Sequence, residues 1–139
     1  MIVEPIHITE INGLPLRMFA SPLYTQFRQA DYPWHSADDL RAILRLPDDL
    51  RALFQQRMKA EWTEQVKTVA TPTGLTMIAP HYMAEGMLKA MQYRRKILPT
   101  EDRRHIRAHY RVAVTSAMMK MLNHMSDTEK VIFALSAHQ

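Results

Sequence analysis

The sequence contains no cysteine, and its 139 residues include only three glycines. The lack of cysteine excludes disulfide bonds, thiolate zinc sites and a cysteine nucleophile. No two glycines lie close enough to form a loop that cradles phosphate. No run approaches the roughly 20 apolar residues of a transmembrane helix, and the first ten residues lack the basic and apolar segments of a signal peptide. We therefore expect a cytoplasmic protein.

Residues typical of catalysis are also scarce. No serine lies in a GxSxG turn, and the paired carboxylates Asp38/Asp39 and Asp48/Asp49 are adjacent residues, which diverge by about 100° on a helix and do not share a site. The nearest metal-like cluster is His35 with Asp38 and Asp39, but both aspartates are explained as first-turn helix residues. We expect no enzymatic activity, no metal and no cofactor.

Charge is unevenly distributed along the chain, whose formal net charge is +4. Residues 1–50 carry four arginines against seven carboxylates, residues 51–99 carry eight basic against three acidic residues, and residues 100–139 carry six against four. The positive excess therefore follows the midpoint, which favours an anionic partner for the second half.

Two β-hairpins are predicted in the first half. Asn12-Gly13 lies between the alternating apolar runs 6–9 and 14–19, which is typical of a two-residue type I′ turn. Residues 66–69 and 75–78 flank a turn over residues 71–74 that ends in Gly74. Ser36 is expected to cap a helix after an extended stretch that contains Pro33. The fold class is therefore α+β, with a small antiparallel sheet packed against helices.

Further helices are predicted from Asp48, Pro80, Thr100 and Ser126. The helix from Asp48 is expected to place Leu50, Leu53, Phe54 and Met58 on one face, and the helix from Ser126 to bury Val131, Ile132 and Leu135. Apolar residues recur at helical spacing from Ile106 to Leu122. Leu98-Pro99 divides the prediction into a domain over 1–98 and a helical extension over 99–139, which either belongs to the same domain or pairs two chains in a homodimer.

The candidate binding residues lie on both sides of this joint. Arginine binds phosphate in a bidentate manner, so a basic edge on a helix suits nucleic acid or an acidic protein surface, although most charge runs are simply solvated. The helical histidines His105 and His109 lie among arginines, which disfavour a metal cation. The candidate nucleic-acid-binding residues are Lys89, Arg94, Arg95, Lys96, Arg103, Arg104, Arg107 and Arg111.

Residues 8–95 resemble the Bro-N domain of baculovirus Bro proteins and phage antirepressors. In that family a hairpin is followed by an aromatic "PWF-A-DV" segment that caps a helix, and residues 32–40 here read YPWHSADDL. A later strand pair with a "T-P-G" turn corresponds to residues 66–78. The family's "NE-GLY" element is replaced here by residues 79–87. The resemblance implies a DNA-binding or regulator-binding module of a phage or prophage, in a bacterial host cell, without catalytic residues.

Two functions follow as hypotheses. The first is an antirepressor-like module that binds double-stranded DNA in transcription control through the basic residues. The second is a phage effector that binds a host repressor, polymerase or defence complex without DNA contact, through the acidic first half or the methionine-rich helices. The basic edge slightly favours DNA.

Overall fold

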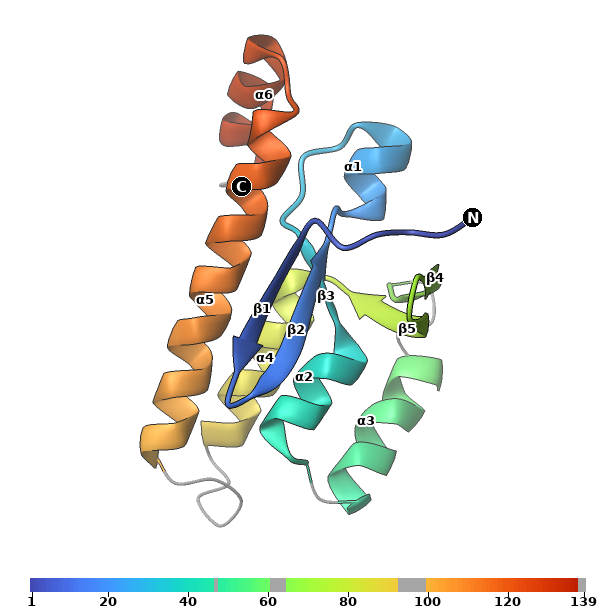
Figure 1. Cartoon of the computed structure of the whole chain (residues 1–139), viewed down its shortest axis with the longest axis vertical. Coiled ribbons are helices and arrows are strands. Elements are labelled where there is room, and N and C mark those ends of the chain that lie inside the picture. Colours follow the sequence, from blue (N-terminus) through green and yellow to red (C-terminus); the bar gives the residue numbers. More distant parts are fainter. Residues whose placement is uncertain (47, 61–64, 93–99, 138–139) are drawn as a thin grey trace.

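The computed structural model describes residues 1–46, 48–60, 65–92 and 100–137, with the side chains of residues 58, 59, 90–92, 100–104 and 136–137 left out. In this part of the chain a five-stranded sheet is flanked by helices, and one long helix runs along its side (Figure 1). The α+β prediction is confirmed.

The first hairpin joins β1 (His7–Ile11) to β2 (Leu14–Phe19), with Ile11 opposite Leu14. Asn12 and Gly13 have φ angles of 54° and 78°. Positive φ at both central residues is the requirement of a type I′ turn, which asparagine and glycine tolerate best. The predicted turn is confirmed.

The second hairpin joins β4 (Lys67–Thr71) to β5 (Gly74–Ala79). Gly74 has a φ of 120°, and the Thr71 hydroxyl donates to its carbonyl oxygen at 2.6 Å. A short strand, β3 (Trp34–Ser36), pairs with β2 and β5, so the sheet order is β1-β2-β3-β5-β4. The extended stretch around Pro33 therefore joins the two hairpins into one antiparallel sheet.

Helices follow the strands closely. The short helix α1 (Pro22–Phe27) follows β2, and α2 (Ala37–Leu44) begins directly after β3. The Ser36 side chain accepts a hydrogen bond from the backbone N–H of Asp39 at 3.1 Å, which confirms the predicted cap. Helices α3 (Asp48–Ala60) and α4 (His81–Gln92) begin close to the predicted positions. On α3, Leu50 is buried and Phe54 partly buried, whereas Leu53 is exposed, so the predicted face is narrower than expected.

Helix α5 (Thr100–Asn123) packs against the first hairpin, beside β1 in Figure 1. Its residues Ile106, Tyr110, Ala113 and Ala117 are buried in the same cluster as Leu16 of β2. This helix therefore shares the main core of the sheet. The joint at Leu98-Pro99 lies outside the described residues.

The last helix, α6 (Asp127–Ala137), differs from the prediction. Val131, Ile132 and Leu135 are 58%, 54% and 69% exposed, whereas Phe133 is buried with Met121. The helix has apolar residues on two faces, and α1 and the end of α5 cover only the face of Phe133. Since no other described element covers the opposite face, the expected burial of these three residues is wrong.

Candidate functional site

The described part of the predicted basic set lies on α4 and α5. Lys89 is exposed in the last turn of α4, and Arg107 and Arg111 lie one turn apart on α5. Arg94, Arg95 and Lys96 lie outside the described residues. Arg103 and Arg104 belong to the beginning of α5, but their side chains are outside the described part.

Glu85 of α4 joins this helix to α5. Its Oε2 lies 3.4 Å from Nη2 of Arg107, and its Oε1 lies 3.4 Å from Nε of Arg111. The glutamate side chain is 25% exposed, against 32% for Arg107 and 58% for Arg111. Residues 89–111 contain eight basic and two acidic residues, so one further carboxylate lowers the positive excess without removing it.

Glu85 was not among the predicted site residues, and it lies 22 and 26 positions from its two partners. One signal points to it. His81, Glu85 and Lys89 follow each other at intervals of four residues, which places them on the same side of α4. Which helix this side contacts depends on the tertiary structure.

Behind the ion pairs lies a buried ring cluster. Nδ1 of His81 lies 2.8 Å from the hydroxyl of Tyr110, and the two rings stack with an interplanar angle of 6°. Tyr110 is fully buried, and burial, together with the charge of Glu85, raises the pKa of its hydroxyl. Nε2 of His81 is 4.0 Å from Glu85, so the cluster connects the core to the basic edge. Tyr110 therefore remains a neutral partner that fixes the position of His81.

The ring of His35, on β3, belongs to the same cluster and packs edge-on against the ring of Tyr110. The imidazole is fully buried, and neither ring nitrogen has a hydrogen-bond partner in the described structure. Burial and the neighbouring His81 lower the pKa of His35 to about 3, so the ring is neutral near pH 7.

The two aspartates near His35 are held by other groups. Asp39 accepts hydrogen bonds from Nε and Nη2 of Arg17 at 2.9 and 3.0 Å. Asp38 accepts from Arg41, from the Thr76 hydroxyl and from the backbone of β5. Among the residues that the structure describes, no three potential metal ligands gather at one place.

His105 and His109 lie side by side on the exposed side of α5. Their ring centroids are 4.1 Å apart, as the spacing of four residues on a helix predicts. Both rings are exposed, and Arg107 and Arg111 lie on the same helix. This setting suits contact with an anion better than coordination of a metal ion.

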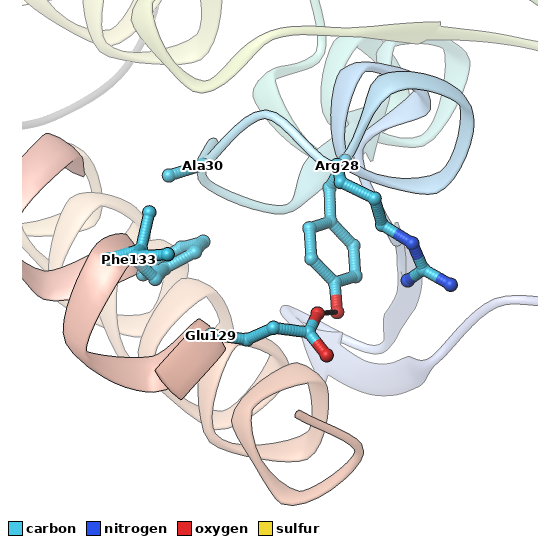
Figure 2. A pocket seen from close by; sticks show the side chains of 6 residues that line it. Arg28, Ala30, Glu129 and Phe133 are labelled. Carbon is cyan, nitrogen blue, oxygen red and sulfur yellow. Dashed lines mark hydrogen bonds between the residues drawn. The ribbon is translucent and has the colours of Figure 1, made fainter. Parts of the chain in front are cut away.

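A second surface feature is a pocket between α1 and α6, with a volume of about 280 Å³. In Figure 2, Ala30 and Phe133 form one side, while Arg28 and Glu129 lie on the other. The Tyr24 hydroxyl donates to Oε2 of Glu129 at 3.1 Å, and this bond lowers the pKa of the Glu129 carboxyl. The guanidinium of Arg28 lies 5.4 Å from the centre of the Tyr24 ring, within cation–π range. The pocket is therefore apolar on one side and charged on the other.

No local sequence signal marks this pocket, since Tyr24 and Glu129 are 105 positions apart. Exposed apolar side chains continue from the pocket along α6. Ile132 lines the pocket, and Val131 and Leu135 are exposed on the same helix. This apolar strip (Val131, Ile132 and Leu135) is the side of α6 that was expected to be buried.

Comparisons with protein-family models, with curated proteins and with solved structures gave no match. The resemblance to Bro-N domains thus rests on the sequence segments quoted above and stays a prediction. No helix in the described ranges combines the length and the hydropathy needed to cross a membrane.

Proposed function

We propose that the chain is a phage- or prophage-type regulator, an antirepressor-like module that binds double-stranded DNA in transcription control through the edge formed by α4 and α5. The observation that supports it best is the joining of the two helices by Glu85, which brings Lys89, Arg107 and Arg111 to one helix pair. Five further basic residues lie between Lys89 and Arg107 in the sequence. Bidentate arginine contacts to phosphate are the chemistry that such an edge supplies.

The resemblance to Bro-N domains supports the same proposal. The two hairpins and the Ser36 cap, which carry that resemblance, are all present in the fold. The proposed setting is the cytoplasm of a bacterial host cell, and no reaction is assigned to the protein.

A salt titration of DNA binding tests the proposal. The affinity of the full chain for a mixed-sequence duplex is measured by fluorescence anisotropy between 50 and 300 mM salt. If Z phosphates are contacted, log K falls against log salt with a slope of about −0.9Z. Affinity that does not change with salt contradicts the proposal.

Charge reversal locates the contact. Replacement of Arg103, Arg104 and Arg107 by glutamate is expected to weaken binding at least tenfold and to make the salt slope shallower. The control variant Lys130→Glu reverses a charge on α6, away from the α4–α5 edge. Equal DNA retention by the triple variant and the control removes the edge from the proposal.

The second candidate function is binding of a host or phage regulatory protein, and the apolar strip of α6 favours it. Contiguous exposed apolar side chains next to a pocket are typical of protein contact sites. The occupant fitting this surface is an amphipathic helix that inserts an apolar side chain beside Phe133 and Ile132. Such a partner would be a repressor, a polymerase or a defence complex.

Nuclease-treated lysate separates the two functions. Capture of a single host protein that survives nuclease, and that is lost in Ile132→Lys but retained in the triple arginine variant, supports the second function. A second copy of the chain pairing through its C-terminal helices is the homodimer alternative, and a light-scattering mass of twice 16.2 kDa would identify it.

A further inference from the structure

A third surface feature, a pocket between α2 and α3, is not used by either function above. It has a volume of about 310 Å³ and is lined by Asp38, Arg41, Ala42, Arg51 and Gln55. Two arginines, one aspartate and one glutamine therefore line a pocket between α2 and α3, two helices whose positions are seen in Figure 1.

Arg41 is buried and incompletely hydrogen-bonded. Only 9% of its side chain is exposed, and its Nη2 donates to Oδ1 of Asp38. Its Nη1 is buried, and no hydrogen-bond partner for this atom is found in the described structure. A buried charged donor without an acceptor is costly because its desolvation is not offset, so Nη1 favours any ligand acceptor that can reach it.

The carboxylate in the pocket does not supply that acceptor. Oδ1 of Asp38 is taken by Arg41, and its Oδ2 accepts from the Thr76 hydroxyl at 2.8 Å and from the backbone N–H of Met77 at 2.9 Å. These bonds hold Asp38 against β5, where it balances one positive charge. The second guanidinium, that of Arg51, leaves the pocket with a positive excess.

The opposite wall belongs to α3. Nη2 of Arg51 makes a long contact of 3.4 Å to the carbonyl oxygen of Leu46, and the side chain is exposed. Gln55 follows four residues later on the same side of α3 and offers an amide N–H group. Both side chains can move toward a ligand at little cost, because neither is fixed by packing.

We propose that this pocket binds the phosphate group of a small ligand, either inorganic phosphate or a phosphate monoester. Donors from Arg41, Arg51 and Gln55 approach from two helices, and a phosphate offers three or more oxygens to them where a carboxylate offers two. Arg41 lines the pocket, and an acceptor oxygen of a ligand that reaches its Nη1 would complete the hydrogen bonding of this guanidinium.

The test is an NMR titration of the full ¹⁵N-labelled chain at constant ionic strength. Inorganic phosphate and adenosine monophosphate are added in separate experiments, and the Gln55 side-chain amide and the backbone amides of α2 and α3 are followed. We expect saturable shifts confined to these residues. Equal affinity for both probes identifies recognition of phosphate alone, and tighter binding of the nucleotide shows that the rest of the ligand enters the cavity.

Two variants and one control make the test specific. Arg51→Gln is expected to weaken binding at least tenfold, and Gln55→Leu, which keeps the charge, severalfold. Both side chains are exposed, so the fold should tolerate either change. Arg57→Gln removes the same charge from the same helix outside the pocket and should leave binding unchanged.

The proposal is overturned if neither probe gives a saturable shift, or if Arg57→Gln weakens binding as much as Arg51→Gln. The second result would mean that phosphate follows the general charge of α3. DNA binding by Arg51→Gln is expected to equal that of the unmodified chain, since the α4–α5 edge is formed by other helices. Failure of the pocket proposal is therefore distinguishable from failure of the DNA proposal.

Discussion

Replacement of Glu85 by glutamine separates the contribution of the α4–α5 edge to stability from its contribution to DNA binding. Glutamine keeps the shape of the side chain but removes the charge that lies 3.4 Å from both Arg107 and Arg111. Ion pairs between partly exposed side chains contribute about 0.2–1 kcal/mol each. We therefore expect the free energy of unfolding to fall by about 0.5–2 kcal/mol, measured by urea denaturation followed by circular dichroism.

The same change is expected to strengthen DNA binding. With the carboxylate gone, the exposed guanidinium of Arg111 and the partly exposed one of Arg107 lose their partner, and one added phosphate contact steepens the salt slope by about 0.9. Near 0.1 M salt this corresponds to roughly fivefold to tenfold tighter binding. A variant that is less stable but binds more tightly would be hard to explain by any general effect on folding.

Fluorescence anisotropy with a labelled duplex, repeated at four salt concentrations, measures both the affinity and the slope. Glu10→Gln is the control, because it removes the same charge from an exposed position on β1. Unchanged or weaker DNA binding by Glu85→Gln, with the slope unaltered, refutes the role of Arg107 and Arg111 as phosphate contacts.

Three further predictions concern the polar groups of the core. Asp39→Ala leaves the half-buried Arg17 without its bidentate partner, and we expect the free energy of unfolding in urea to fall by about 2–4 kcal/mol. A fall below about 1 kcal/mol would show that the hydroxyls of Thr71 and Thr73 are sufficient partners for Arg17. Tyr110→Phe removes the 2.8 Å bond to His81 and should cost about 1 kcal/mol, with an NMR-monitored change in the His81 titration; an unaltered titration would contradict the contact. His35 has a pKa of about 3 in the folded chain, against the ordinary histidine value of 6.5, so the unfolded chain binds the proton first as the pH falls. The stability is therefore complete above pH 6.5 and decreases as the pH drops toward 3. In His35→Leu this dependence should be flatter by up to about 1.4 kcal/mol per pH unit, and identical pH profiles for both chains would show that His35 is not the titrating group.

Several elements of the fold could be predicted because their causes are local. Asn12-Gly13 specifies a turn with positive φ whatever surrounds it, and Ser36 caps α2 through a bond to a residue three positions away. The helical spacing of apolar residues from Ile106 to Leu122 predicted one buried side of α5, and Ile106, Tyr110, Ala113 and Ala117 are buried there.

The candidate sites were predictable only in part. The basic composition of residues 89–111 was evident, but the pairing of Arg107 and Arg111 with Glu85 was not. The phosphate-binding proposal depends on Arg41, which in the sequence is one arginine on the edge of a helix. Its burial results from the packing of α2 against β2 and β5, and its Nη1 has no partner in the described structure.

By itself, the sequence determined the hairpin turns, the helix starts and the concentration of positive charge after the midpoint, because each depends on residues within a few positions of one another. Only the tertiary structure decided which face of α6 is buried and which carboxylate each arginine meets. These outcomes depend on how whole helices are rotated against one another, and that rotation is set by long-range packing that no local pattern encodes.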